Sequence, residues 1–450
     1  MKNTPKFIFL FVFFILVLMT ACSIGSIATS PTMTPYVITA TMEPTSEVDQ
    51  FLTQTAEIPP AAEPDAHSIP TELHLVYTDT TGNLNRWTQA AGASPLLSTG
   101  DILGGRLSDD GQWVAFTRST DYIHFSLWVV AFDGSGEREL VSSDTLMTFK
   151  NHDDAIGVEP YIFSWVPNSH TIAFNTSPKF DGPGLLVNDD LHLVDAETGV
   201  LTTLLTPGNG GVFYYSPDGS QIALVTPENI SLINADGTNR RSNVLVYDSV
   251  LTYSEYAYYA DPHWSADSSF LRVAIPPHDS MGDPTQPTTL WQIPTDGSAA
   301  GVAGHVNTAP LSGVTISPDL SFIAYVDYFS GDSDPMRNLH INTFMGTSDH
   351  IYSTGQIAVN TWAPDSRHFV YTEYGANVTK FADKDGGEVL LFPSGPVTDI
   401  DFVDNTAYIY LKSDGTNWEL AYRTLDGAQT TIATMPNTGT GKFPGYSFVN

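Results

Sequence analysis

The chain has 450 residues, of which 42% are hydrophobic and 15% charged, so it has ample apolar surface for a large folded core. Its 18 basic and 50 acidic residues give a net charge of −32. This balance argues against binding to nucleic acid or anionic lipid, both of which need a basic surface, and it suits solubility, cations or basic partners.

The first residues have the pattern of a secretory signal peptide. Lys2 and Lys6 precede an apolar run from Phe7 to Met19, which is too short for a comfortable membrane span. The run ends in Met19-Thr20-Ala21-Cys22, which resembles the lipobox of bacterial lipoproteins, although Met19 stands where Leu is preferred. Cys22 is the only cysteine, so an internal disulfide is excluded and its thiol is free for acylation.

The resemblance implies cleavage after residue 21 and attachment of diacylglycerol and palmitate at Cys22. We therefore expect an exported protein that is anchored by lipid to the cell membrane or an outer membrane and faces the periplasm or the cell exterior. The mature chain would carry 16 basic and 50 acidic residues, a net charge of −34.

Residues 22–70 are predicted to form a disordered tether. They are rich in Thr, Pro, Ser and Ala, and they contain six acidic residues but no Lys or Arg. Such a segment has too little apolar surface to offset the entropy lost on ordering. The folded part is predicted to span residues 71–450.

A turn motif recurs along this folded part. Its clearest copy is Ser216-Pro217-Asp218-Gly219, which lies between short segments rich in β-branched and aromatic residues. Pro presets φ for the turn, Asp bonds nearby amides, and Gly completes the turn. Further copies occur at 108–111, 166–169, 265–268, 317–320 and 363–366, with a worn copy at 402–405, at intervals of 39 to 58 residues.

Each interval has room for four short antiparallel strands, which is one blade of a β-propeller. The segments Leu127–Phe132 and Glu139–Val141, for example, supply a third and a fourth strand after the first motif. A stacked β-solenoid is the alternative, but its repeats are much shorter. We predict an all-β propeller.

The number of blades depends on the two ends. Seven motifs give seven blades, and three further strands, Leu73–Tyr77, Asn83–Trp87 and Leu96–Ser98, precede the first motif. The C-terminal segment Gly445–Asn450 reads as the inner strand that this unit lacks. If both ends share one blade, the ring closes without free sheet edges. We predict eight blades, with seven as the alternative.

The Ser-Pro-Asp-Gly turn, the following Ile222-Ala223-Leu224 and the later Leu127-Trp128 strand resemble the TolB-type, WD-repeat-like propeller repeat. The resemblance covers residues 72–450 and implies the fold. This chain departs from TolB in its lipid-anchor signal and in lacking a separate α/β domain. The eight-bladed ring is also similar to the propellers of dipeptidyl peptidases, whose hydrolase domain has no counterpart here.

Motifs for catalysis are missing from the sequence. There is no G-x-S-x-G, H-E-x-x-H, C-x-x-C or P-loop, and Gly445-Tyr446-Ser447 lacks the rest of a nucleophile elbow. We expect no enzyme activity, no catalytic residue and no cofactor. A hydrolase built on the propeller is the least favoured function.

Long insertions identify one rim of the ring as the candidate binding face. Loops between second and third strands and loops between blades emerge on the same rim, and binding residues concentrate on such loops. Two features of these loops are suggestive: tyrosines suit stacking on sugars or peptides, and acidic oxygens could hold Ca²⁺, although no recognised calcium-loop spacing is present. The long insertions are 177–190, 276–289, 329–338, 143–159, 247–262 and 304–312, and the candidate residues are Asp153, Asp154, Asp181, Asp189, Asp190, Tyr253, Tyr256, Tyr258, Tyr259, Asp279, Asp283, Tyr328, Asp332 and Asp334.

Two non-catalytic functions are compatible with these features. The first is a membrane-tethered module, monomeric in itself, that binds a protein, a peptide or a glycan through this rim. The second is an accessory or sensor lipoprotein of an envelope or transport complex, with a small ligand or cation in the central channel. Neither involves nucleic acid, and contact with the membrane would be made only through the lipid.

Overall fold

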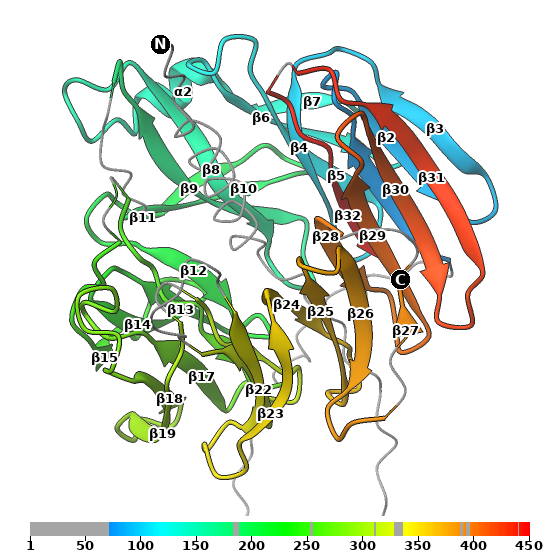
Figure 1. Cartoon of the computed structure of the whole chain (residues 1–450). Helices are drawn as coiled ribbons and strands as arrows, with labels where there is room; N and C mark the ends of the chain where they lie inside the picture. The colour runs from blue at the N-terminus through cyan, green and yellow to red at the C-terminus, as the bar shows by residue number, and fades with distance from the viewer. Residues whose placement is uncertain are drawn as a thin grey trace, which may run out of the picture.

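The computed structural model describes residues 72–182, 189–252, 254, 256–309, 312–327, 336–387, 390–392, 397–439 and 441–450. These residues form eight four-stranded antiparallel sheets that follow one another around a ring (Figure 1). The prediction of an eight-bladed β-propeller is confirmed. Within the described ranges, no helix is long and apolar enough to cross a membrane.

Blade 1 combines both ends of the chain. Its strands, from the centre outward, are β32 (Gly445–Val449), β1 (His74–Thr78), β2 (Leu84–Thr88) and β3 (Gly92–Leu97). All five residues of β1 pair with β32, from His74↔Val449 to Thr78↔Gly445. The predicted closure by a C-terminal inner strand is therefore correct, and the predicted strands differ from the observed ones by only a few residues.

The other seven blades each use four consecutive strands. Blades 2 to 4 contain β4 (Ile102–Leu107), β5 (Trp113–Arg118), β6 (Ser126–Ala131) and β7 (Arg138–Val141); β8 (Gly157–Trp165), β9 (Thr171–Lys179), β10 (Leu191–Asp195) and β11 (Leu201–Leu205); and β12 (Val212–Tyr215), β13 (Gln221–Val225), β14 (Asn229–Asn234) and β15 (Arg241–Val246).

Blades 5 and 6 contain β16 (His263–Trp264), β17 (Phe270–Ile275), β18 (Thr288–Pro294) and β19 (Gly301–Val306), then β20 (Thr315–Ile316), β21 (Phe322–Val326), β22 (Arg337–Thr343) and β23 (His350–Gly355). Blades 7 and 8 contain β24 (Ile357–Trp362), β25 (His368–Glu373), β26 (Val378–Asp383) and β27 (Leu390–Leu391), then β28 (Asp399–Phe402), β29 (Ala407–Ser413), β30 (Asn417–Thr424) and β31 (Gln429–Pro436).

The apolar core is divided among the interfaces between blades. Strand residues alternate between the two faces of each sheet, so every blade offers one apolar face to each neighbour. Each of the eight buried clusters joins two successive blades, and together they account for all eight interfaces of the ring. First strands of neighbouring blades pack on each other, as β32 does on β4, which places them around the central axis.

The recurring turn motif fixes the connection between first and second strands. In its clearest copy, Ser216 Oγ donates to Asp218 (2.6 Å) and accepts from the Gln221 amide (2.9 Å), while Gly219 has φ of +71°. A serine and an aspartate bond in the same way in blades 2, 5 and 6, at Ser108–Asp110, Ser265–Asp267 and Ser317–Asp319. The motif therefore acts as a structural turn.

A tryptophan next to this turn bonds to the preceding blade. The indole Nε1 of Trp362 donates to the Thr315 carbonyl (3.0 Å), and Trp165 and Trp264 make the equivalent bonds to Arg106 (3.0 Å) and Tyr214 (3.1 Å). These three bonds connect blades 6 and 7, 2 and 3, and 4 and 5.

Strand direction gives the ring two different rims. Loops between second and third strands and between successive blades lie on one rim, which we call the insertion rim. Turns between first and second strands and between third and fourth strands lie on the other, which we call the short-turn rim. The folded chain begins at the short-turn rim, where the His74 ring stacks on Phe132 (4.2 Å between centroids) and its Nδ1 lies 3.2 Å from the Gly111 carbonyl.

Some residues predicted as loop belong to strands: 288–289 to β18, 304–306 to β19 and 337–338 to β22. Two further local features differ from the sequence prediction. Residues 157–159 and 177–179, predicted as loop, extend the β8–β9 hairpin through pairs such as Glu159↔Ser177, and Lys179 forms an ion pair with Glu159. A short helix, α2 (Ser143–Met147), follows β7; the Ser142 hydroxyl caps it by accepting from Thr145 N, and Leu146 is buried. A single helical turn gives too weak a periodic signal to be predicted.

Candidate functional site

The insertion rim carries the long loops that the sequence predicts. Their described residues are 142–156, 180–182, 189–190, 247–252, 254, 256–262, 276–287, 307–309, 312–314, 327 and 336. Each joins a second to a third strand or one blade to the next, as expected.

Exposed apolar side chains are concentrated on this rim. Fourteen large apolar side chains are exposed among the described residues, and only Val200 and Met345 lie in turns of the short-turn rim. Four others, Tyr161, Val246, Val302 and Ile351, belong to strands. The remaining eight, which we call the rim apolar set, are Tyr122, Ile156, Leu251, Tyr256, Met281, Met336, Tyr374 and Phe443.

The predicted tyrosine loop divides into packed and exposed residues. Tyr256 is 42% exposed, whereas Tyr258 and Tyr259 pack against the core between blades 4 and 5. Burial raises the pKa of Tyr258, whose hydroxyl donates to the Ala274 carbonyl (3.4 Å). Tyr253 lies outside the described residues. Of the described tyrosines in this loop, Tyr256 alone is exposed.

The predicted acidic residues of blades 2 and 3 differ in accessibility. Asp153, Asp154 and Asp181 are exposed. Asp189 accepts a hydrogen bond from Asn151 (3.3 Å), and burial together with Asp190 raises the pKa of Asp189.

Asp190 is not part of the accessible surface. It is 1% exposed, and its carboxylate accepts from the Thr176 amide (2.8 Å) and faces His192 Nε2 at 3.0 Å. His192 is buried in turn, stacked on Phe149 at 3.9 Å between centroids. Asp190 therefore anchors the end of its loop, and its proposed place on the binding face is corrected.

The predicted acidic residues of blade 5 shape their own loop. Asp279 accepts from the Gly282 amide (2.7 Å), and Asp283 accepts from Thr285 Oγ1 (2.6 Å) and Gln286 Nε2 (3.0 Å). Carboxylates bonded in this way fold turns. Tyr328, Asp332 and Asp334 lie outside the described residues.

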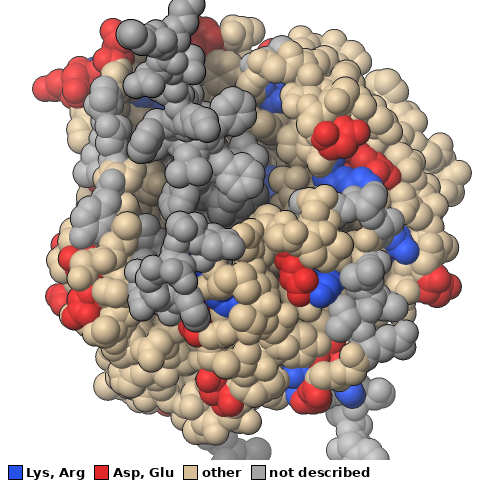
Figure 2. All heavy atoms as spheres, in the orientation of Figure 1, with Lys and Arg blue, Asp and Glu red and all other residues tan. Residues whose placement is uncertain are grey.

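No metal centre is formed by the part of the chain that the structure describes, since no three His, Cys, Asp or Glu side chains are placed to hold an ion there. Figure 2 shows Asp and Glu side chains on the visible face in small separate groups, several of them beside Lys or Arg. The acidic side chains of this face are therefore spread out and do not form one large patch.

A second polar cluster lies on the inner strands of the three adjacent blades 8, 1 and 2, near the central axis. Asp399 and Asp401 lie two residues apart on inner strand β28, while Ile400 between them packs toward blade 7. Opposite them are Arg106 on β4 and Tyr446 on β32. Burial and the charge of Asp399 raise the pKa of Asp401 to about 6, and burial also raises the pKa of Asp399.

This cluster was not predicted from the sequence. We call it the channel cluster, and it consists of Arg106, Asp399, Asp401 and Tyr446. The sequence feature that could have indicated the cluster is the alternation of acidic and apolar residues in Asp399-Ile400-Asp401-Phe402, the strand that leads into the worn copy of the turn motif. Two carboxylates on one face of an inner strand must face the next blade near the axis. Burial and a neighbouring like charge shift the pKa values of such groups, and groups with shifted pKa values often mark functional sites.

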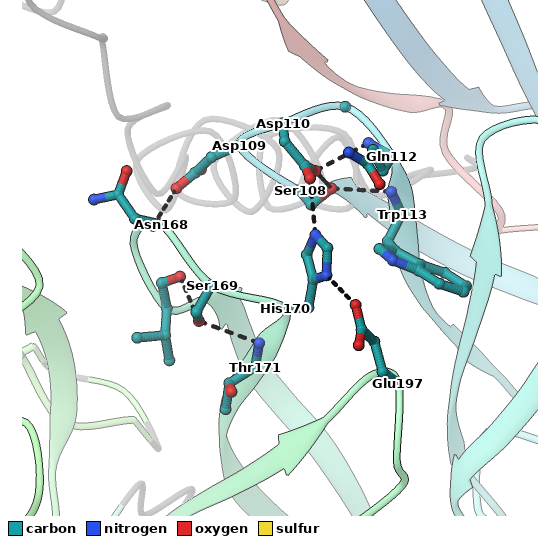
Figure 3. Close-up of polar contacts among 12 residues, drawn as sticks. Ser108, Asp109, Asp110, Gln112, Trp113, Asn168, Ser169, His170, Thr171 and Glu197 are labelled. Carbon is teal, nitrogen blue, oxygen red and sulfur yellow. Dashed lines mark hydrogen bonds and ion pairs between the residues drawn. The ribbon is translucent and has the colours of Figure 1, made fainter. Parts of the chain in front are cut away.

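A serine, an aspartate and a histidine also meet between blades 2 and 3, but their order differs from that of a hydrolase (Figure 3). Ser108 Oγ donates to Asp110 (2.6 Å), and His170 Nε2 lies 2.8 Å from the other oxygen of the same carboxylate. Since Ser108 donates to the carboxylate, His170 is not placed as its base. His170 Nδ1 lies 2.7 Å from Glu197, so the network links turns of the short-turn rim.

This network makes stability depend on pH. Burial opposes the charged form of His170, but bonds to Asp110 and Glu197 outweigh it and raise the pKa of His170. Burial likewise opposes the charge of Asp110, but bonds from Ser108 and His170 lower its pKa. The stability contributed by His170 is fully present below its unfolded pKa of about 6.5 and is lost as pH rises through the raised folded pKa. The stability contributed by Asp110 is fully present above its unfolded pKa of about 4 and is lost as pH falls through the lowered folded pKa.

We expect His170→Gln to lower the free energy of unfolding by about 1.5–3 kcal/mol at pH 5.5, the range for hydrogen bonds to charged groups, and by less at pH 8.5. Urea unfolding at both pH values measures the difference. The control is His124→Gln, because His124 is exposed and pairs with Asp121 within its own turn. A loss at His170 that is equal at both pH values would contradict the protonated bridge.

Comparisons with known proteins show the fold. No protein-family model and no curated protein matches the sequence. The structure is similar to a crystal structure of the eukaryotic initiation factor, with 12% identity, a TM-score of 0.51, and coverage of 81% of this chain and 85% of that chain. It is also similar to Porphyromonas gingivalis dipeptidyl peptidase 4, with 12% identity, a TM-score of 0.50, and coverage of 83% of this chain and 59% of that one.

TolB from Acinetobacter baumannii is a weaker structural match, with 13% identity, a TM-score of 0.38, and coverage of 82% of this chain and 78% of that chain. At 12% identity, the similarities to the initiation factor and to dipeptidyl peptidase 4 show the fold alone. Function must therefore be argued from the rims and the channel.

Proposed function

We propose that this protein is a lipid-tethered, extracytoplasmic binding module that contacts a protein, a peptide or a glycan through its insertion rim. The observation that carries the proposal is the rim apolar set: eight exposed apolar side chains lie in the loops of this rim, against two in the turns of the other. Apolar side chains gathered on one face mark interaction surfaces, since solvent alone does not favour their exposure there. The tether and the Cys22 lipid form part of the proposal on the strength of the sequence.

A non-catalytic role is part of the same proposal. Two arguments support it: the motifs of hydrolases are missing from the sequence, and Ser108 donates its proton to a carboxylate instead of to a histidine. We further propose that the protein is monomeric and binds no nucleic acid, in keeping with its acidity.

The rim is tested by comparing two variants in glycan and peptide arrays and in affinity measurements on purified hits. The rim variant combines Tyr122→Ser, Tyr374→Ser and Phe443→Ser, and the matched control combines Val200→Ser and Met345→Ser on the short-turn rim. We expect the rim variant to weaken binding at least about tenfold, since each buried apolar side chain contributes about 1.5–3 kcal/mol. Equal affinity of both variants would contradict a role for the insertion rim.

The channel cluster favours a second candidate, an accessory or sensor protein that holds a cation or small ligand near the axis. Burial raises the pKa of both carboxyls, and the charge of Asp399 raises that of Asp401 further, while Arg106 lowers both. A bound cation would add to the effect of Arg106 and favour the ionised pair. Because the folded pKa of Asp401 exceeds the unfolded one, stability falls as pH rises through about 4 to 6.

For this candidate we expect Ca²⁺ or spermidine to raise the melting temperature at pH 7.5, where the pair is ionised, and not at pH 5. Asp401→Asn should remove the effect and leave the protein at least as stable at pH 7.5. Melting curves with and without EDTA provide the comparison. Unchanged melting with either cation would exclude a cation site here, and a drop with EDTA in Asp401→Asn would indicate a metal elsewhere.

A further inference from the structure

Two loops of the insertion rim form one continuous unit between blades 4 and 5. The unit comprises residues 247–252, 256–262 and 276–287, and we call it the blade 4–5 sector. The Leu251 amide donates to the His278 carbonyl (2.8 Å), and the His278 ring contacts the Ser249 carbonyl. These bonds bring the two loops together although they belong to different blades.

The sector presents a group of exposed apolar side chains. Leu251, Tyr256 and Met281 are 39%, 42% and 53% exposed, and they form three of the eight members of the rim apolar set. Leu251 lies beside His278 through its backbone bond, and Met281 follows three residues later. Thr252 Oγ1 donates to the Tyr256 carbonyl (2.7 Å), which holds the tyrosine backbone close to Leu251.

The sector is also uniformly acidic. Residues 247–262 and 276–287 contain Asp248, Glu255, Asp261, Asp279 and Asp283 but no Lys or Arg. Two other insertion-rim loops carry a lysine, Lys150 before β8 and Lys442 before β32, whereas residues 180–190, 307–314 and 327–336 also contain no Lys or Arg. The side chain of Asp261 is 69% exposed, and Asp248 is exposed as well. Asp261 pairs with His263 at 3.5 Å, and the sector as a whole keeps an excess of acidic over basic side chains. Apolar anchors and net negative charge thus coincide in this sector.

The loops are held in place before any partner binds. Asp279 and Asp283 each accept hydrogen bonds within their own loop, and Tyr258 and Tyr259 pack below it on the core. A surface that is already ordered loses little entropy on binding, so its apolar area contributes more fully to affinity.

We infer that the blade 4–5 sector binds a polypeptide segment in which Lys or Arg residues alternate with large apolar residues. This inference deepens the proposed function and rests on it. The partner's apolar side chains would cover Leu251, Tyr256 and Met281, and its cations would lie beside the aspartates. Charge complementarity selects the partner and speeds association, while the apolar anchors supply affinity.

The experiment measures binding of labelled 12-residue peptides to the full mature chain by fluorescence anisotropy. The probes are a Lys/Leu/Trp peptide, the same peptide with Glu for Lys, and a Lys/Ser peptide that carries charge alone. The sector variant is Leu251→Ser with Met281→Ser, the charge variant is Asp248→Lys, and the control is Val200→Ser with Met345→Ser.

We expect the Lys/Leu/Trp peptide to bind best, with at least tenfold weaker binding to the sector variant and unchanged binding to the control. The charge variant should lower affinity several-fold at low salt, and high salt should reduce that difference. Circular dichroism and melting curves of each variant confirm that it is folded.

Three results would overturn the inference: no binding of the Lys/Leu/Trp peptide at millimolar concentration, equal binding of the Glu peptide, or equal loss in the control variant. If the array hits described above still lose affinity in the rim variant, the proposed function stands and only this assignment of the partner fails. If those hits are insensitive to the rim variant as well, both fail.

Discussion

Deleting residues 445–450 should prevent the chain from forming a stable ring. Strand β32 pairs with the whole of β1 and packs on β4, and it supplies Tyr446, Phe448 and Val449 to the interfaces of blade 1. Each of these side chains contributes about 1.5–3 kcal/mol when buried, so the loss is comparable to the 5–15 kcal/mol total stability of a typical protein. The exposed β1 edge would also favour aggregation.

Melting curves and light scattering of the deletion variant measure both effects. A synthetic peptide of residues 441–450 should restore the melting temperature when added, and a scrambled peptide should not. Removing residues 23–70 instead should leave melting unchanged if that segment is a tether, which makes it the matched deletion. A ring that melts within about 3 °C of the full chain without β32 would show that this strand does not close it.

Trp362→Ala should be among the most destabilising single substitutions, at about 3–5 kcal/mol. Trp362 is buried between blades 6 and 7, where it packs on Phe369 at 5.4 Å between ring centroids. Its indole also donates to the Thr315 carbonyl of the preceding blade. Trp362→Phe keeps most of the packing but removes part of the ring and the hydrogen bond between blades, so we expect a loss of about 1–3 kcal/mol.

The control for this pair is Trp128→Phe, because the Trp128 indole bonds to Ser126 within its own strand. We expect that substitution to cost less than about 1 kcal/mol. Urea unfolding of the three variants gives the comparison. If Trp362→Phe and Trp128→Phe cost the same, the hydrogen bond between blades does not contribute.

The fold was predictable because its repeat is local. Ser216, Asp218 and Gly219 carry a turn whose hydrogen bonds lie within five residues, so the chemistry of each copy is visible in the sequence. The missing inner strand could be predicted from a topological need, because a ring has no free edges. The length of the β8–β9 hairpin depends on pairs such as Gly157↔Lys179, and no local signal sets their number.

The candidate sites were only partly predictable because exposure depends on packing across loops. The sequence places Tyr256 and Tyr258 in one loop, but it does not tell that Tyr258 packs into the blade and Tyr256 does not. Asp190 looked accessible because the sequence does not show that Thr176 and His192 enclose it. The channel cluster joins residues from β4, β28 and β32, which only ring closure brings together.

Strand β1 begins at His74, and this position decides on which rim an N-terminal tether would join the propeller. His74 contacts Gly111 and Phe132 on the short-turn rim, opposite the insertion rim. If residues 22–70 form a flexible tether to a lipid, that tether joins the fold on the rim opposite the long loops, so those loops can point away from the membrane. Partners arriving from the surroundings would meet Leu251, Tyr256 and Met281 first, and the lipid bilayer would not compete for them.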